Sequence, residues 1–387
     1  MPPNVEAAKI STFECGGNND ETPSQQYREW NIPASAKSMR TMNPIRAIVD
    51  PIVASSVKCG KERGDGKDQI SLALGDPSAY PNLPPLPPLI SSATLSAQSS
   101  HTRGYVNACG SPKSRAAIAH FHSHGTKKVS PEDVIIANGC SGALELALTA
   151  LLDEGTCLLV PRPGFPLYRV IAESHGARVR YYDLSPDNDW ECDLESIEKV
   201  ICEEGSRVRG IVINNPSNPC GSVFSKEHLQ NVVALAERYK LVIVSDEVYG
   251  SITFGRMFYP MGEIANGRVP VITASGLGKQ FLVPGWRVGW LIIHDCEEKP
   301  LRYVKKGIQN LAAVILGASH LAQNALISIF HPETPSIATV VDNWRQNLNN
   351  ILKSQSQVTF ELLSSCHGLT PIQSCGAMYT MVKINFE

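Results

Sequence analysis

The chain has 387 residues, enough to bury a large core and to form about two or three domains. Its 35 basic and 37 acidic residues give a formal net charge of -2, which does not indicate nucleic acid or an anionic membrane as a partner. No apolar run is long enough to span a bilayer, and the 11 cysteines include no Cys-x-x-Cys pair. We therefore expect a cytoplasmic protein with reduced, mostly structural thiols.

Residues 1–37 are polar and interrupted by glycine and proline, a composition that predicts a flexible N-terminal arm. They contain neither the apolar core of a secretory signal nor the acid-poor, arginine-rich pattern of a transit peptide. The Gly/Lys/Asp-rich stretch 59–68 predicts an exposed loop. Five prolines then exclude a central strand or a helix interior: Pro81, Pro84, Pro85, Pro87 and Pro88.

From about residue 133, short apolar strands alternate with helices. This alternation predicts an α/β fold with a mostly parallel sheet covered on both faces. The strands are expected at 134–136, 157–160, 179–182, 208–213, 241–244 and 271–274, and the helices at 141–152, 193–204 and 225–239, the last with Ser225 as its N-cap. Beyond Asp295 we expect helices through 311–330 and 337–353 and a strand at 378–384.

Four residues with chemically useful groups follow predicted strands. They are Gly139, Asn218, Asp246 and Lys279. Because parallel sheets bind ligands at the carboxyl ends of their strands, we expect these residues to share one edge. Their order and separation match the needs of pyridoxal 5'-phosphate (PLP), whose chemistry requires a protein to bind, orient and polarise the cofactor.

Each residue has a specific part in this hypothesis. Lys279 forms a Schiff base with PLP and, once released, moves the proton of the substrate's Cα. Asp246 keeps the ring nitrogen protonated, while Tyr249 and Asn218 reach the ring oxygen. Arg287, eight positions after Lys279, offers a fork of donors to the phosphate.

Two further elements complete the predicted cofactor site. Gly139, Cys140 and Ser141 lie where a strand meets a helix, and the N-terminus of such a helix binds anions. Phe165 can stack on the cofactor ring. Singly, each of these residues has an ordinary structural explanation, such as a tight turn or a core aromatic. The ordered set is what favours a PLP site.

The histidine run His120, His122 and His124 suggests a metal site at first. No acidic or cysteine partner lies nearby at ligand spacing, and the run ends a helix before Gly125. We interpret it as a solvated helix end without function, and we predict no metal.

Several stretches resemble the class I PLP-dependent aminotransferases, and among them the tyrosine aminotransferases. The resemblance extends from about Trp30 to the last residues. Two stretches point to the tyrosine subfamily: Asn-Pro-Ile-Arg-Ala-Ile-Val-Asp at 43–50 and Leu-Val-Pro-Gly-Trp-Arg at 282–287. The others are 74–77, 160–165 with Leu167-Tyr168, 214–224 and 374–379.

The resemblance implies a fold type I transferase with a large PLP-binding domain at 76–317. It implies a smaller α+β domain at 38–75 and 318–387, incomplete at its C-terminal end. It also implies a homodimer, with Tyr105 reaching the phosphate of the partner subunit. The backbone of Gly75 would lie beside the substrate, and Asn218 would contact it too. The roles given above to Lys279, Asp246 and the other cofactor residues are the family's roles as well.

Three departures from the family pattern stand out. The position three before Lys279, often a phosphate-binding serine, is Gly276, as in some tyrosine aminotransferases; Ser275 is a weak substitute. Cys140 and Cys220 suggest thiol sensitivity. No residue matches the arginine that grips the substrate carboxylate, which the family carries beyond the stretch at 374–379. Two explanations stay open: a chain that binds PLP with little turnover, and part of a full-length enzyme.

The expected activity follows from the resemblance. It is transfer of the amino group of L-tyrosine to 2-oxoglutarate, giving 4-hydroxyphenylpyruvate and glutamate in the catabolism of phenylalanine and tyrosine. Two alternatives remain. One is another PLP reaction on this scaffold, by an alanine- or methionine-type aminotransferase or a carbon–sulfur lyase. The other is a truncated, non-catalytic PLP-binding protein.

Overall fold

The computed structural model describes residues 33–58, 72, 75–79, 82–123, 128–332 and 334–386, with the side chains of 53–58 left aside. Most of the predicted arm and the predicted loop at 59–68 lie outside these residues. Ala36–Glu387 forms one compact unit. The predicted boundaries of a large and a small domain within it stay a prediction.

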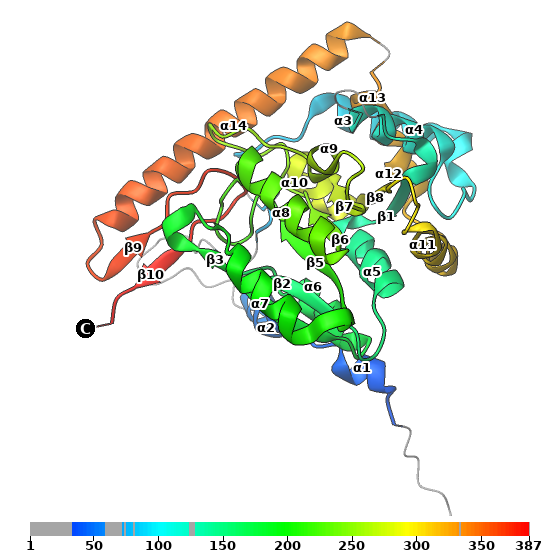
Figure 1. Cartoon of the computed structure of the whole chain (residues 1–387). Helices are drawn as coiled ribbons and strands as arrows, with labels where there is room; N and C mark the ends of the chain where they lie inside the picture. Colours follow the sequence, from blue (N-terminus) through cyan, green and yellow to red (C-terminus); the bar gives the residue numbers. More distant parts are fainter. Residues whose placement is uncertain are drawn as a thin grey trace, which may run out of the picture. The chain divides into compact units, whose positions relative to one another are not determined.

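An eight-stranded sheet runs through the centre of this unit, in the order β1-β8-β7-β6-β5-β2-β3-β4 (Figure 1). Neighbours from β7 to β3 pair in parallel, whereas β8 runs antiparallel to both β7 and β1. The mostly parallel sheet is thus confirmed. The strands are β1 Val134–Asn138, β2 Cys157–Arg162, β3 Arg178–Ser185, β4 Glu191–Cys192, β5 Val208–Asn214, β6 Val242–Asp246, β7 Val271–Gly276 and β8 Val288–His294.

Helices cover both faces of the sheet. Because successive side chains of a strand point to opposite faces, they pack in different hydrophobic clusters. Ile211 and Ile213 of β5 pack in one hydrophobic cluster, and Val212 between them packs in the other. Burying such a side chain contributes about 1.5–3 kcal/mol, which accounts for strands that are apolar throughout. The first cluster includes side chains of α7 Leu194–Glu204, α8 Lys226–Tyr239 and α9 Met261–Ala265; the second includes α5 Gly139–Leu151, α6 Leu167–Ser174 and α11 Arg302–Ile315.

Local signals set the helix ends. Ser225 caps α8, its side chain accepting from the backbone N–H of His228, as predicted. The predicted helical region 311–330 is interrupted: α11 ends before Gly317, whose φ of +80° is a left-handed conformation that favours glycine. The other helices are α1 Ala36–Arg40, α2 Pro44–Lys58, α3 Pro87–Gln98, α4 Pro112–Phe121, α10 Leu277–Gln280, α12 His320–Ala325, α13 Ile327–Phe330 and α14 Pro335–Ser364.

The long helix α14 is followed by a small two-stranded sheet (Figure 1). It pairs β9 Leu369–Pro371 with β10 Val382–Ile384 in antiparallel fashion. The predicted strand at 378–384 is therefore shorter than expected. Just before it, Gly376 forms an isolated antiparallel bridge with Thr253, outside both sheets.

The histidine run agrees with its prediction in part. His120 is exposed in the last turn of α4, whereas His122 Nε2 accepts a hydrogen bond of 3.1 Å from the indole N–H of buried Trp290. His124 lies outside the described residues. Across the described ranges, no group of three potential metal ligands comes together. Nor does any helix there have the length and apolar character to cross a membrane.

Candidate active site

The edge formed by the carboxyl ends of β1, β5, β6 and β7 brings the predicted residues together. Lys279 lies on α10, immediately after β7, and its Nζ donates a hydrogen bond to the backbone oxygen of Gly75. Burial lowers the pKa of Lys279, Asp76 opposes this change, and Arg287 adds to it. A larger fraction of the amine is therefore neutral than in a solvated lysine, as a nucleophile or base requires.

Asp246 ends β6 and is fully enclosed. One carboxylate oxygen accepts from the hydroxyl of Tyr168 at 2.7 Å. The other accepts from the N–H of Val248 at 3.2 Å and from the thiol of Cys140 at 3.6 Å. Burial raises the pKa of Asp246, and these three bonds counteract it. The carboxylate is thus held in one orientation by several donors.

Tyr249 is buried, 3% exposed, three positions after Asp246. Its hydroxyl lies 2.7 Å from the hydroxyl of Tyr379, and the two rings meet edge to face. Tyr379 and Tyr168 were not predicted as site residues. Both lie in stretches that carry the family resemblance. Their periodicity alone indicates only aromatic residues of the core.

Asn218 lies in the turn after β5, at the same edge. Its backbone N–H donates to the Asn214 side chain at 2.7 Å, and the Asn214 amide donates to the backbone oxygen of Asp246 at 3.1 Å. The turn that carries Asn218 and the strand end that carries Asp246 are therefore linked through the buried Asn214 side chain. Cys220, in the same turn, is buried, and burial raises the pKa of its thiol to about 11, so it is not a reactive thiolate.

Arg287 directly precedes β8, and its side chain reaches the N-terminus of α5. One of its terminal nitrogens donates to the backbone oxygen of Asn138 and to the hydroxyl of Ser141, both at 3.1 Å. Gly139, the first residue of α5, has a φ of +74°, and a Cβ there would overlap the Arg287 guanidinium. This arrangement of guanidinium, hydroxyl and helix N-terminus provides donors for a phosphate.

Gly139→Ala is expected to weaken PLP binding by about 10- to 100-fold, because it displaces Arg287 and strains a left-handed backbone. Gly155→Ala is the matched control: Gly155 has a φ of +82°, with open space where its Cβ would lie. Equilibrium dialysis with PLP measures the difference, and thermal unfolding measures the backbone strain that both variants share. Equal PLP affinity in the two variants would contradict a phosphate site at Arg287.

The remaining predicted residues take different places. Phe165 packs edge-on against Tyr168, with ring centroids 5.8 Å apart, so it lies close to the Asp246 carboxylate. Tyr105 is 92% exposed. Ser275 is not available as a phosphate ligand, because its buried hydroxyl bonds the Gln280 amide and the backbone oxygen of Glu247. Gly276 approaches β8 so closely that a Cβ would lie 2.9 Å from the Val288 oxygen.

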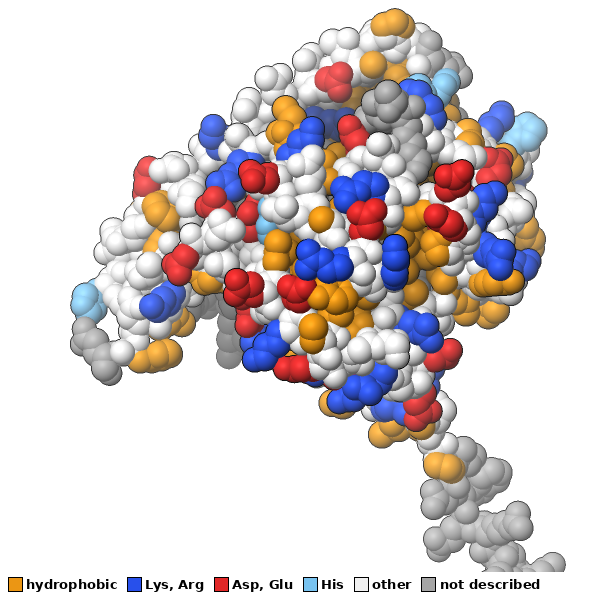
Figure 2. All heavy atoms as spheres, viewed as in Figure 1, with side chains coloured by type: hydrophobic (Ala, Val, Ile, Leu, Met, Phe, Trp, Pro, Cys, Tyr) orange, Lys and Arg blue, Asp and Glu red, His pale blue; other side chains and the backbone are white. Residues whose placement is uncertain are grey.

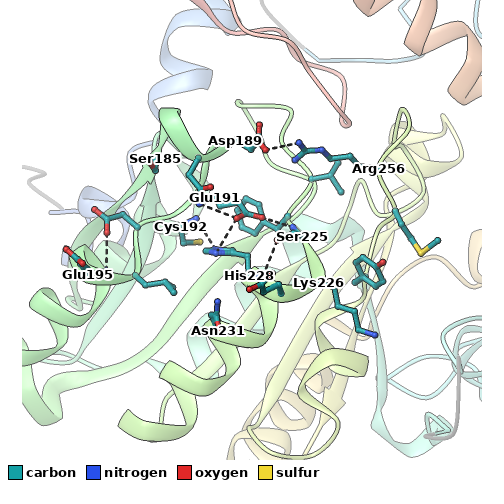
Figure 3. A pocket seen from close by; sticks show the side chains of 18 residues that line it. Ser185, Asp189, Glu191, Cys192, Glu195, Ser225, Lys226, His228, Asn231 and Arg256 are labelled. Carbon is teal, nitrogen blue, oxygen red and sulfur yellow. Dashed lines mark hydrogen bonds and ion pairs between the residues drawn. The ribbon is translucent and has the colours of Figure 1, made fainter.

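The described residues line cavities of different size. A cavity of about 270 Å³ is lined by Asn138, Ser141 and Arg287 and adjoins the candidate site. A larger one of about 840 Å³ lies near β4 and the N-termini of α7 and α8, away from the predicted residues (Figure 3). On the face drawn in Figure 2, basic and acidic side chains are interspersed, as the near-zero net charge suggests.

The polar groups of the larger cavity bond mainly to one another. His228 Nε2 accepts from the N–H of Cys192 at 3.1 Å, and its Nδ1 faces Glu191 at 3.5 Å (Figure 3). Glu191 also accepts from the N–H of Ser225 at 2.7 Å. These bonds fasten β4 to the start of α8, which is a structural role. We therefore place the candidate active site at the edge that carries Lys279, despite its smaller cavity.

Comparison with known proteins places the chain in a family. The family model of "Aminotransferase class I and II" matches residues 67–387. Tyrosine aminotransferase of Mus musculus is 40% identical over 92% of this chain and 75% of its own length, and that of Dictyostelium discoideum is 38% identical over 92% and 83%. The crystal structure of tyrosine aminotransferase from Leishmania infantum superposes with a TM-score of 0.81 at 27% identity, covering 93% of this chain and 84% of that one.

Proposed function

This chain belongs to the class I and II aminotransferases, and from that membership we propose that it transfers the amino group of L-tyrosine to 2-oxoglutarate. The products are 4-hydroxyphenylpyruvate and glutamate. Five relatives named tyrosine aminotransferase, from mammals, a nematode and an amoeba, are 36–40% identical to it over 92% of the chain. The observation that carries the proposal is the set of partly buried Lys279 with buried Asp246 and Tyr249 at one edge of the sheet.

The residues present fit PLP, the cofactor of this family in general. Because Gly139 has no Cβ, the Arg287 guanidinium can lie against the start of α5, where its donors and the helix N–H groups can bind one phosphate. Asp246 is a buried carboxylate held by donors, suited to a protonated ring nitrogen. Lys279 is a buried amine with a lowered pKa, suited to bonding an aldehyde.

Each residue then has a defined task. Arg287 and Ser141 would hold the phosphate, with the N–H groups of Gly139 and Cys140 at the helix start. Tyr249 and Asn218 would contact the ring oxygen, and Phe165 would stack on the ring. When bound, PLP supplies the electron sink that makes the α-proton of an amino acid removable. Lys279 Nζ would move that proton from the substrate's Cα to the cofactor's aldehyde carbon, and Gly75 would lie beside the substrate.

We also propose a homodimer, with Tyr105 completing the partner's phosphate site. Tyr105 is exposed, and so are three consecutive apolar residues at the end of α11, of which Val314 is 82% exposed. The others are Ile315 and Leu316, and Ile315 also lines the smaller cavity beside Arg287. Covering these side chains with a second copy would remove apolar surface from water close to the phosphate residues.

Absorbance spectroscopy and product analysis test the proposed function directly. The chain with PLP is expected to show a visible absorption band that L-tyrosine removes and 2-oxoglutarate restores, with 4-hydroxyphenylpyruvate and glutamate formed in equal amounts. L-Alanine and L-methionine serve as competing donors, because an alanine aminotransferase from Pyrococcus furiosus also superposes with a TM-score of 0.81.

The alternatives give other results. A band that responds to alanine and not to tyrosine would change the substrate assignment. Repeated formation of keto acid without 2-oxoglutarate, well beyond one equivalent per PLP and with release of ammonia, would indicate lyase chemistry. A band that no amino acid alters would indicate a binding protein without turnover, and the absence of any band in folded protein would overturn the PLP assignment.

A further inference from the structure

We propose that Tyr379 is a positioning residue of the active site, whose hydroxyl donates to Tyr249 and strengthens the hydrogen bond from Tyr249 to the cofactor's ring oxygen. The inference rests on the proposed function, since it assumes that Tyr249 faces PLP. It assigns a role to a side chain for which composition and periodicity give no indication.

The contact between the two phenols is short and sheltered. Their oxygens lie 2.7 Å apart, and their rings meet at 86° with centroids 5.8 Å apart. Tyr249 is almost completely buried, and Tyr379 is partly buried in the same hydrophobic cluster. In such surroundings a hydrogen bond is stronger than in water, and an unpaired hydroxyl is costly.

The number of protons determines the direction of the bond. Each phenol has one proton to donate. If Tyr249 donates its proton to the cofactor's ring oxygen, its own oxygen can only accept, and Tyr379 must be the donor. Successive bonds of this kind polarise one another, so that Tyr249 becomes a stronger donor to the ring oxygen.

Both phenols stay protonated near neutral pH, as this arrangement requires. Burial raises the pKa of Tyr249 well above its usual value, and the neighbouring Tyr379, Asp246 and Cys140 raise it further. Burial also raises the pKa of Tyr379, whereas its bond with Tyr249 lowers it, the direction expected while Tyr249 is the donor; donation by Tyr249 to the ring oxygen would reverse the pair. Among the described residues, Asp246 and Cys140 act on the pair, and the Lys279 amine lies across Gly75 from Tyr379.

The backbone around Tyr379 is fixed to the cofactor-contacting turns. The Ser374 hydroxyl donates to the backbone oxygen of Tyr379 at 2.5 Å. The N–H groups of Cys375 and Gly376 both donate to the backbone oxygen of Gly221, at 2.8 and 2.9 Å. Ala377 donates in the same way to Ile252. Tyr379 is therefore held against the turn that carries Asn218 and the segment that follows Tyr249.

A second contact links Tyr379 to the catalytic lysine. A Cβ at Gly75 would lie 2.7 Å from the Tyr379 hydroxyl oxygen. Any larger residue at position 75 would therefore collide with this phenol. The backbone oxygen of Gly75 accepts from Lys279 Nζ. Tyr379 thus contacts both the residue assigned to the ring oxygen and the residue beside the reactive amine.

Tyr379→Phe tests the proposal, because it keeps the ring and removes only the hydroxyl. The readout is the pH midpoint at which the visible band of the PLP-loaded protein changes. Donors to the ring oxygen withdraw electron density from it, so the proton shared with the Lys279 nitrogen is held less tightly. Weaker donation should therefore raise the midpoint, by roughly half a pH unit for one neutral hydrogen bond.

A double-variant cycle separates positioning from a structural effect. Tyr249→Phe should raise the midpoint further than Tyr379→Phe, and the double variant should match Tyr249→Phe alone. Tyr303→Phe, at a side chain 73% exposed, is the control and should leave the midpoint unchanged. Thermal unfolding of the cofactor-free proteins measures folding independently of PLP.

Each result has a distinct meaning. An unchanged midpoint in Tyr379→Phe, or a further rise in the double variant over Tyr249→Phe, would overturn the role of Tyr379 while leaving the proposed function intact. If the unsubstituted, folded chain shows no visible band with PLP, the proposed function is wrong and the inference is wrong with it.

Discussion

Lys279→Ala is expected to abolish amino transfer, with kcat lower by about 10⁴-fold or more, because one change removes both the nucleophile and the base. The visible band should disappear as well. Borohydride reduction of the unsubstituted PLP-loaded protein, followed by peptide mass spectrometry, should locate the cofactor on Lys279. In the variant, no peptide should carry it.

The loss should not result from unfolding. Burial lowers the pKa of Lys279, so the fold disfavours the charged amine and is destabilised by it at pH values below the ordinary lysine pKa. Removing the amine should therefore leave the melting temperature of the cofactor-free protein unchanged or higher at neutral pH. Lys353→Ala, on the exposed surface of α14, is the matched control. Turnover by Lys279→Ala above about one hundredth of the original would exclude the assigned role.

Asp246→Asn is expected to reduce kcat by about 10²- to 10³-fold, because it removes the charge that stabilises a protonated ring nitrogen. The amide also fits its surroundings poorly. The carboxylate accepts from Tyr168 on one side and from Val248 N–H on the other, and an amide has only one acceptor oxygen. One of these donors therefore loses its partner.

Tyr168→Phe separates the two effects of Asp246→Asn. It removes one donor to Asp246 and keeps the charge, so its turnover should fall by only a few-fold. Single-turnover kinetics with L-tyrosine measures both variants at the proton-transfer stage. Similar losses in the two would mean that orientation of the carboxylate, and not its charge, is the larger contribution.

The sequence predicted the sheet and the edge that holds the site because both depend on local patterns. Apolar runs such as 208–213 indicated buried strands, and Asp246 and Lys279 follow such strands directly. Strand β8 was not predicted from periodicity, although its residues are nearly all apolar and buried. Its antiparallel pairing with β1 joins residues more than a hundred positions apart, which a local pattern does not encode.

The contacts between site residues were harder to predict than their presence. Nothing in the local sequence indicates that the Tyr168 hydroxyl reaches Asp246, since the two are separated by 78 positions. Ser275 shows the opposite case: its position beside Gly276 suggested a phosphate ligand, but the pleat of β7 turns its hydroxyl toward Gln280. Side-chain direction at a strand end decides such questions, and it depends on the neighbouring strands.

The segment around Tyr379 has a consequence for the order in which the protein matures during synthesis. Tyr249 leaves the ribosome 130 residues before Tyr379, an interval of roughly 7 to 26 s at ordinary translation rates. In that interval the parallel strands can already pair, while the backbone oxygens of Gly221 and Ile252 still lack the partners that residues 375–377 supply. A nascent chain can therefore form the edge that carries Asp246 before Tyr379 can reach the hydroxyl of Tyr249. The contact between the two phenols is thus among the last to form during synthesis.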